Sequence, residues 1–437
     1  MSAAGAVPES PTSISSRRLG VTATGALGVV LLAWAISVDY TRVSYGFFSD
    51  GATYYSLAHS LAEDFDFEFR RDDLVRVWRE YPSGPEGIFL KRGTDLDVGV
   101  SSSFPFLQVT GRPDPNNSRL YYGKSFIFAL AAAPFVFVFG TNGFLVLHAV
   151  LMTLCFAAAY AFLVTRSPPH IALAFATAFL LVSAAPVYMV WMTPNFFDMA
   201  LVLLGYFFWA YKEAASGMPA FNPKNRWLFG ARSDVMAAVF LGIATFSKPT
   251  HIMLIAPMLT LPLLRRDWRR LLLIGTVYAA IVGGLFGSNI LITGEWNYQG
   301  GDRRTFYSGA GGFPFQTEQG TFDAIGQGRA TDGVAVDLLS SRDTIITVFG
   351  HNLIYFLVGR HTGFAVYYFP GVMAVLLFLV SRGSRPAWQW LTLAAGVGSA
   401  IVFLLYMPFT YSGGGGPVGN RYFLSVYPVF LYETVCS

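Results

Sequence analysis

Charged residues are scarce in this sequence. Asp, Glu, Lys and Arg make up 13% of its 437 residues, whereas 54% are hydrophobic and the mean hydropathy is +0.48. Soluble globular proteins carry about 25% charged residues. The shortage of charge therefore excludes an ordinary soluble protein and predicts a chain that crosses a membrane several times.

Cysteine and histidine are also rare. The two cysteines, Cys155 within an apolar run and Cys436 near the end of the sequence, are too few for a disulfide framework. The six histidines lack the spacing of metal ligands, so hydrogen bonding at the membrane interface is the simpler role for most of them. The net charge is only +4, and the basic residues stand mostly in short loops, where they report orientation in the membrane rather than binding to nucleic acid.

Apolar runs recur from residue 19 almost to the last residue, and their lengths predict about nine or ten transmembrane helices. Residues 1–18 are rich in Ser, Ala and Pro and predict a disordered cytoplasmic tail, because Arg17 and Arg18 keep the N-terminus inside. The basic loops at 212–234 and 265–270 then also lie inside. We therefore expect an all-α polytopic protein of the plasma (inner) membrane, in which residues 19–437 form one transmembrane domain.

Two long polar segments, 39–124 and 293–343, interrupt the apolar runs and are expected as outer loops. Each precedes a short apolar stretch, at 125–139 and 344–358, which predicts a re-entrant or surface helix rather than a full span. The last apolar run, 423–432, is too short to cross a membrane. This run gives the sequence the look of a truncated chain.

A polar stretch directly after the first span combines helical periodicity with an acidic residue. From Tyr54, apolar residues recur at i, i+3, i+4 and i+7, which predicts an amphipathic helix on the membrane surface with Ser49 as its N-cap. Asp50 would lie in the first turn, where the helix N-terminus favours the ionised carboxylate. It is a candidate general base or cation ligand, and stabilisation of the helix dipole is the alternative reading.

The expected topology gathers ionisable residues at the outer membrane face. They are Asp50, Lys124, Asp198, Lys248, His251, Arg360, His361 and Arg421. A catalytic or binding site needs such a set of groups at one face.

Three short motifs carry a resemblance to a known superfamily. An acid with aromatic neighbours follows the first span (Ser49–Tyr55), a lysine precedes a short apolar helix (Tyr122–Ser125), and a second acid opens the fourth span (Thr193–Met199). In these motifs, and in the turn around Lys248 and the basic loop at 265–270, the chain resembles the GT-C superfamily of integral-membrane glycosyltransferases, which includes protein O-mannosyltransferases and the lipid A aminoarabinose transferase. The likeness extends over roughly residues 20–430, although Asp50-Gly51 stands where many members have Asp-Glu.

The resemblance implies a hexosyl- or pentosyltransferase that moves a sugar from a polyprenyl-phosphate-linked donor to a hydroxyl of a lipid, glycan or protein acceptor on the non-cytoplasmic face. Such chemistry requires a base for the hydroxyl proton and cations for the departing phosphate. Asp50 is the expected base, and Asp198 would orient the acceptor or share a divalent cation with Asp50. The expected phosphate ligands are Lys124, Lys248 and Arg421, and the candidate substrate contacts are Tyr54, His251 and His361.

Other readings stay open at this point. Asp198 can be a helix cap, Lys248 can extend its ammonium to the interface, and Arg421 after its glycine-rich loop can be ordinary loop charge. The chain as a whole can also be a polytopic transporter or lipid flippase, whose binding groups are expected at the bilayer midplane on broken helices, or an assembly factor without catalysis. Spans poor in charge and polar groups at one face favour chemistry at the interface.

Overall fold

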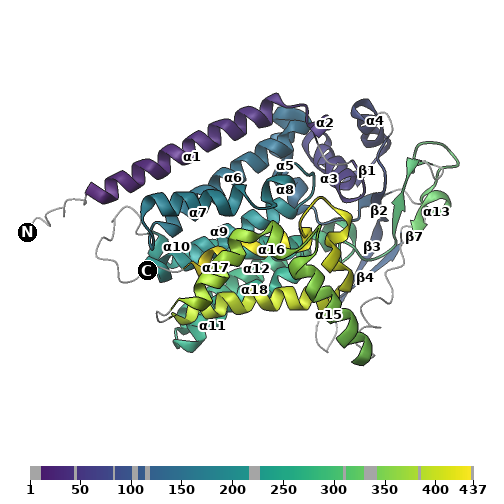
Figure 1. Ribbon diagram of the computed structural model, residues 1–437. Helices are drawn as coiled ribbons and strands as arrows, with labels where there is room; N and C mark the ends of the chain where they lie inside the picture. The colour runs from purple at the N-terminus through teal and green to yellow at the C-terminus, as the bar shows by residue number, and fades with distance from the viewer. Residues whose placement is uncertain are drawn as a thin grey trace, which may run out of the picture.

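The structure is a computed structural model that describes most of the chain. The residues outside its description are 1–10, 44–46, 82–83, 101–106, 114–118, 216–226, 309–311, 329–341, 382–384 and 435–437. The described part is mostly helical, with a small sheet at one end of a helical bundle (Figure 1). Four helical segments are long and apolar enough to cross a membrane, which indicates a membrane protein. They are Ser15–Ser37, Ile127–Leu163, Trp268–Thr293 and Ala387–Leu405.

Helix α1 (Pro11–Ser37) runs along the outside of the bundle against α6 (Gly143–Leu163) (Figure 1). Gly20 allows the close approach, because a Cβ at this position would lie 2.2 Å from the ring of Tyr160. The disordered tail expected over residues 1–18 is therefore too long, since residues 11–18 already belong to α1.

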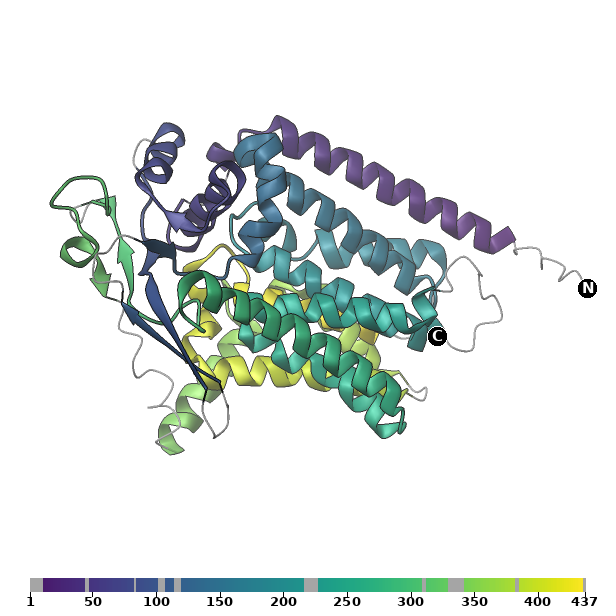
Figure 2. The same ribbon diagram turned by 180° about the vertical axis from the view of Figure 1, so that it is seen from behind.

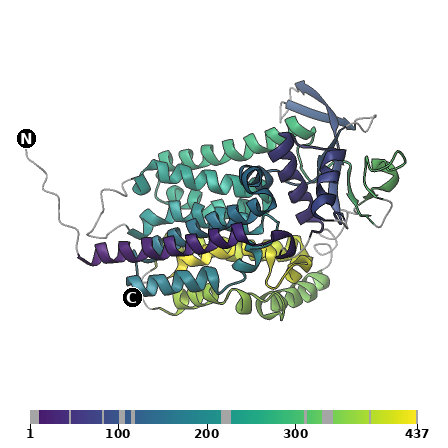
Figure 3. The ribbon, with the colours of Figure 1, turned by 90° about the horizontal axis from the view of Figure 1, so that it is seen from above.

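Helix α10 (Ala231–Ser247) packs against α9 (Asn195–Ala215) on one side and α12 (Trp268–Thr293) on the other, and α12 lies at the edge of the bundle with few buried residues. A Cβ on Gly242 of α10 would lie 2.8 Å from Ile281 of α12, so the small residue lets the two backbones approach. Viewed from above, the helices lie side by side and the sheet stands beyond their ends (Figure 3).

Several expected spans are broken helices. The run at 171–190 forms α7 (Pro169–Leu181) and α8 (Ala185–Met189), and the run at 364–380 forms α16 (Phe364–Tyr367) and α17 (Phe369–Val380). The two breaks meet, because the Ala184 amide donates to the Tyr367 carbonyl at 2.9 Å. A third run forms the 3-10 segment η4 (Pro249–Ile255) and α11 (Ala256–Leu264).

The two short apolar stretches form α5 (Ile127–Phe139) and α15 (Arg342–Val358). Helix α5 ends at Gly140, whose φ of 57° breaks the helical path, and it packs back against the following α6. The last part of the described chain contains α18 (Ala387–Tyr406), η6 (Pro408–Gly415), α19 (Arg421–Leu424) and η7 (Tyr427–Glu433). The η7 segment is buried in the bundle.

The expectation of an all-α fold is wrong at the two long loops, which share one antiparallel sheet. Its strand order is β1-β5-β2-β6-β7. The strands are β1 (Glu68–Phe69), β5 (Leu120–Tyr122), β2 (Ile88–Arg92), β6 (Arg303–Phe306) and β7 (Gln327–Gly328), and β3 (Thr94–Val100) pairs with β4 (Leu107–Pro113) in a separate hairpin. The β2–β6 pairing joins the loops to each other, and Figure 2 shows the sheet at the end of the bundle opposite the start of α1.

The helix expected on the membrane surface is instead a buried one. Residues Asp50–His59 form α3 and Ser60–Asp64 continue it as a π-helical turn, and Gly51 through Ala62 are buried on every side. The helix packs against α5, β2 and α4 (Arg71–Glu80). Ser49 does not cap it through its side chain, because its φ of 52° is unsuited to that role. The short helices α2 (Tyr40–Val43) and α13 (Phe322–Ile325) complete the loops.

Candidate functional site

Asp50 lies in the first turn of α3, as the sequence predicts, and has a cation on each carboxylate oxygen. Its Oδ1 lies 2.6 Å from the Lys124 ammonium, and its Oδ2 lies 3.5 Å from the Arg421 guanidinium. The Asp50 side chain is about a quarter exposed, whereas both cations are more deeply buried. Three of the expected site residues therefore meet at one point, although they come from distant parts of the chain.

Lys124 is positioned by the sheet. It follows β5 directly, and the amide of Gly123 donates to the carbonyl of Phe89 in β2 at 2.9 Å. The Lys124 ammonium lies 4.5 Å from the centroid of the Phe89 ring, which is a favourable cation–π distance. The strand pairing of the outer loops thus brings the lysine to Asp50.

Arg421 is held by the glycine-rich loop. It opens α19, and Asn420 before it accepts hydrogen bonds from the Tyr422 and Phe423 amides. The guanidinium lies 5.2 Å from the Trp191 ring centroid and donates to the Gly414 carbonyl at 3.2 Å. The Asn420 cap, the Trp191 ring and the Gly414 carbonyl together orient the Arg421 side chain toward Asp50.

The glycine-rich loop in turn packs on the helix breaks. The Tyr188 hydroxyl donates to the Gly419 carbonyl at 2.8 Å, and the Tyr368 hydroxyl donates to the Asn420 carbonyl at 2.7 Å. A Cβ on Gly419 would lie 2.7 Å from Ala184, at the break between α7 and α8. The broken helices therefore serve to place the loop that carries Arg421.

Asp198 forms a second acidic centre. It is fully buried in the first turn of α9, with one carboxylate oxygen 3.1 Å from the Lys248 ammonium. Lys248 also donates to Asn195 Oδ1 at 2.6 Å. Neither oxygen of Asp198 accepts a hydrogen bond from the residues that the structure describes. A buried carboxylate with one ion-pair partner retains acceptor capacity for a hydroxyl group.

Tyr54 lies in α3, one turn after Asp50, and the charges of both carboxylates act on its phenol. It is buried in α3, and burial raises the pKa of its phenol well above the ordinary value, with the charges of Asp50 and Asp198 and the neighbouring Tyr298 adding to the shift. The Tyr54 phenol is therefore close enough to sense both carboxylates. Tyr298, which sequence reasoning missed, donates to the Ser247 carbonyl at 2.8 Å beside the turn that carries Lys248.

The two histidines expected to contact substrate, His251 and His361, differ in burial. His251 is fully buried, with Nδ1 2.8 Å from the Ala244 carbonyl and Nε2 2.7 Å from Ser425 Oγ, so it ties η4 to the segment after α19. The His361 side chain is exposed, and its carbonyl accepts from the Gly419 amide at 2.8 Å. Contact of either imidazole with substrate stays a prediction.

The acidic residues do not form a cation site of three or more side-chain ligands. No group of three His, Cys, Asp or Glu side chains with metal-ligand geometry occurs in the part of the chain that the structure describes. Asp50 and Asp198 each have a lysine within 3.1 Å, and an ammonium at that distance occupies the place of a divalent cation.

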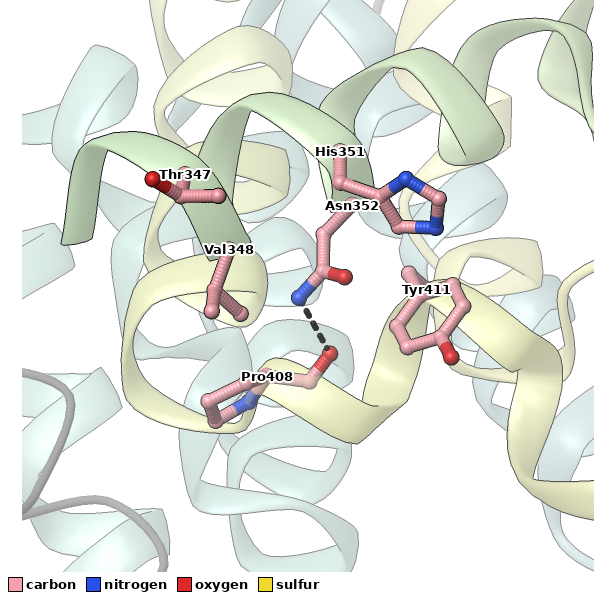
Figure 4. Close-up of a pocket in the computed structure, with 6 residues that line it drawn as sticks. All are labelled: Thr347, Val348, His351, Asn352, Pro408 and Tyr411. Carbon is pink, nitrogen blue, oxygen red and sulfur yellow. Dashed lines mark hydrogen bonds between the residues drawn. The ribbon is translucent and has the colours of Figure 1, made fainter. Parts of the chain in front are cut away.

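A hollow of about 520 Å³ lies between α15 and η6, where Asn352 donates to the Pro408 carbonyl and His351 stands near Tyr411 (Figure 4). None of the expected site residues lines it. The hollow borders the backbone that Asn420 holds through its bond to the Thr410 carbonyl at 2.6 Å. The hollow is therefore not part of the acidic centres.

A separate set of charges lies at the other end of α9. Glu213 accepts from Arg265 at 2.8 Å and from Arg270 at 2.7 Å, and Asp234 pairs with Lys212 and with Arg270. Fifteen residues of helix place Glu213 about 22 Å from Asp198 along the axis. The loops that the sequence assigns to the inner side thus carry a buried ion network that is remote from the site.

Comparison with known proteins gives no relative: no family model, curated protein or solved structure matches the chain. The function must therefore be argued from the charges and contacts of the site itself.

Proposed function

We propose that this protein is a GT-C-type membrane glycosyltransferase, which moves a sugar from a polyprenyl-phosphate-linked donor to an acceptor hydroxyl on the outer face. The observation that carries the proposal is the placement of Asp50 between Lys124 and Arg421. A carboxylate that touches two cations combines a base with an anion-binding pair. Sugar transfer from a phosphate requires both in the same place.

In the proposed reaction, Asp50 accepts the proton of the acceptor hydroxyl while that oxygen attacks the anomeric carbon. The bond between this carbon and the phosphate oxygen breaks, and the phosphate departs with the electron pair. Lys124 and Arg421 then stabilise the charge that develops on the leaving oxygen. Because these cations contact Asp50, an incoming phosphate competes for them and leaves the carboxylate able to take a proton.

Asp198 and Lys248 form the second half of the proposed site. Three cations, Lys124, Arg421 and Lys248, face the two carboxylates, so the cluster has one positive charge in excess for an anionic donor. Asp198, which keeps acceptor capacity beside its ion pair with Lys248, would orient the acceptor by hydrogen bonding to one of its hydroxyls. Tyr54, close to both acids, would contact the sugar between them.

The proposed topology follows the charge pattern of the sequence. About nine or ten spans, a cytoplasmic N-terminus and the shared sheet outside would place Asp50 and Asp198 at the outer face. The position of the Glu213 network at the far end of α9 supports this arrangement, because it assigns the basic loops and the site to opposite ends of one helix.

A transporter or lipid flippase is the second candidate, and the broken helices favour it. In transporters, however, the breaks expose backbone groups to the substrate at the midplane. Here the Ala184 amide and the Tyr367 carbonyl satisfy each other at the breaks. The acidic residues lie at helix starts rather than in mid-helix, which fits interfacial chemistry better.

The test is a transfer assay in membranes with a panel of labelled polyprenyl-phosphate sugars. Asp50→Asn should lower the rate at least about 100-fold, since general-base catalysis contributes about 10²–10⁴-fold. Asp72→Asn is the matched control, because Asp72 also lies in the first turn of a helix but is exposed. Equal rates for Asp50→Asn and the native protein would remove Asp50 from the mechanism. Movement of donor lipid across the membrane without transfer would favour the flippase.

A further inference from the structure

The hollow between α15 and η6 has the size and the lining of a small-molecule site. Its volume of about 520 Å³ falls within the range of about 300–1,000 Å³ that is usual for ligand pockets. The described residues that line it are Thr347, Val348, His351, Asn352, Pro408 and Tyr411 (Figure 4). None of these six is Asp, Glu, Lys or Arg, so the lining offers no carboxylate, ammonium or guanidinium to an ion and favours a neutral ligand.

Asn352 presents an unused hydrogen-bond acceptor to this hollow. The residue is only 3% exposed, and its amide nitrogen donates to the Pro408 carbonyl at 3.0 Å. Among the described residues this is the only hydrogen bond of the Asn352 side chain, so the amide oxygen keeps its acceptor capacity. Figure 4 shows this oxygen on the side of the His351 and Tyr411 rings. A buried acceptor in such a place requires a ligand that donates a hydrogen bond.

Aromatic rings form one wall of the hollow. The ring centroids of His351 and Tyr411 lie 6.4 Å apart at an interplanar angle of 77°. Tyr355 meets Tyr411 nearly at a right angle, with centroids 5.4 Å apart, and these contacts hold the Tyr411 ring in place. Aromatic surface beside a hydrogen-bonding group suits a sugar, because a sugar ring has apolar C–H faces and hydroxyl groups at its rim.

A hydrocarbon chain suits the hollow less well than a sugar. It would cover the Asn352 oxygen without donating to it, and a buried acceptor that is left unsatisfied is costly. A sugar hydroxyl donates to that oxygen, while Val348 and Pro408 provide apolar surface for the ring. The lining therefore favours a neutral ring with hydroxyl groups over a lipid tail.

The η6 segment connects the hollow to the proposed donor site. Tyr411 lines the hollow, and Gly414, three residues later, accepts from the Arg421 guanidinium at 3.2 Å. Asn420 holds the same segment from the other side, because its amide nitrogen donates to the Thr410 carbonyl at 2.6 Å. A ligand in the hollow therefore lies beside the loop that holds Arg421.

We propose that this hollow binds a sugar unit of the acceptor, which makes the acceptor a carbohydrate. The Asn352 oxygen accepts a hydrogen bond from a hydroxyl of this unit, and the His351 and Tyr411 rings contact its C–H face. The residues of the hollow position the acceptor and take no part in breaking or forming bonds. The assignment to the acceptor rests on the proposed transfer reaction, whereas sugar binding in the hollow does not.

Two kinds of probe separate these claims. Neutral methyl glycosides of mannose, glucose, galactose and arabinose probe the hollow, and polyprenyl phosphate probes the donor site. The full chain is reconstituted in lipid nanodiscs. Saturation-transfer NMR titrations measure the affinity for each glycoside, titration calorimetry measures polyprenyl phosphate binding, and thermal unfolding midpoints show which variants are folded.

Val348→Trp fills the hollow from α15 and should weaken binding of at least one glycoside about tenfold or more. Asn352→Leu removes the acceptor without filling the hollow and should weaken the same glycoside about five- to tenfold, the effect of one hydrogen bond. Val358→Trp is the matched control, because it makes the same change on the same helix at a residue that is 63% exposed and does not line the hollow. Polyprenyl phosphate binding should be native in all three variants.

The transfer assay tests the assignment to the acceptor. With a glycan acceptor, Val348→Trp should raise the acceptor KM about tenfold or more and leave kcat within about twofold of the native value, because a binding contact away from the reacting atoms is lost. The KM for the donor should not change. Val358→Trp should have native values of all three constants.

Each other outcome overturns a defined part of the inference. The sugar site fails if the native chain binds no glycoside of the panel, or if Val358→Trp weakens binding as much as Val348→Trp. Loss of polyprenyl phosphate binding in a folded Val348→Trp protein would assign the hollow to the chain of the donor. Glycoside binding that depends on Val348, together with a native acceptor KM, would remove the acceptor assignment alone. If no donor supports transfer while glycoside binding depends on Val348, the proposed function fails and the sugar site stands.

Discussion

Lys124 and Asp50 form an ion pair of 2.6 Å that joins the end of a strand in one outer loop to the start of a buried helix 74 positions earlier in the chain. The pair links the sheet to the bundle. Because Arg421 approaches the other oxygen of Asp50, the carboxylate also links the 39–124 segment to the glycine-rich loop. The electrostatic balance at Asp50 therefore depends on three separate parts of the fold.

Neutralising Lys124 should impair transfer while Asp50 remains in place. Lys124→Gln is expected to lower kcat about 10²- to 10³-fold, the usual effect of losing one group that stabilises developing negative charge. Lys124→Arg keeps the charge and should recover most of that loss. Initial rates at saturating donor measure both effects. A Lys124→Gln protein with native kcat would show that the lysine only neutralises Asp50.

Adding a methyl group to Gly419 should destabilise the loop that holds Arg421. Its φ of 84° and the 2.7 Å approach of a new Cβ to Ala184 both oppose a side chain. Gly419→Ala should therefore cost about 1–3 kcal/mol of stability. Gly287→Ala in α12 is the control, because nothing lies within 4 Å of its Cβ, and it should add about 0.5–1 kcal/mol. Thermal unfolding in detergent measures the difference, and equal midpoints would contradict the packing argument.

The sequence predicts those features that depend on local pattern. Apolar run length locates the helices of the bundle, and the placement of Asp50 in a first turn is confirmed. Asp198, expected to open a span, lies one turn further inside, because α9 already begins at Asn195. The sequence also indicates the helix break at 182–184, because Pro186 would disrupt an uninterrupted helix through this run. Asn195 could also have been found, because it precedes Asp198 by three residues and therefore shares its helix face.

The features that the sequence does not predict depend on contacts between segments that are distant in the chain. The strands of the shared sheet have two to five residues, which is too short for an alternation of apolar and polar residues to be recognised. Strand β2 pairs with β6, which lies more than 200 residues later in the sequence. The α3 helix has polar residues such as Ser56 that indicate a surface, yet packing by α5 and the sheet buries them. Lys91 gives no sequence signal, since its burial and its pairing with Arg303 exist only in the assembled sheet.

The stability of the protein should depend on pH through Lys91. Burial lowers the pKa of its ammonium from the ordinary 10.5 to about 8, with Arg303 adding to the shift and Glu295 opposing it. Between these values the unfolded chain holds a proton that the folded chain has released, so the Lys91 contribution to stability rises as the pH rises from about 8. Lys91→Met should be more stable than the native protein at pH 7, and the gap should shrink by pH 9.5. Unfolding midpoints at the two pH values measure this, and a constant gap would show that burial does not lower the pKa of Lys91.

Breaking the remote ion network should affect folding and spare catalysis. Glu213→Gln removes the buried carboxylate that pairs with Arg265 and Arg270. Because Arg270 still pairs with Asp234 and Arg265 is half exposed, we expect a cost of about 1–3 kcal/mol. Glu318→Gln makes the same chemical change at an exposed position and should change stability by less than about 0.5 kcal/mol. The lowered unfolding midpoint should come with a native transfer rate per folded molecule, because about 22 Å of helix separates Glu213 from Asp198. A loss of transfer at native stability would instead mean that the two ends of α9 communicate, and it would move the functional boundary of the site to the inner face.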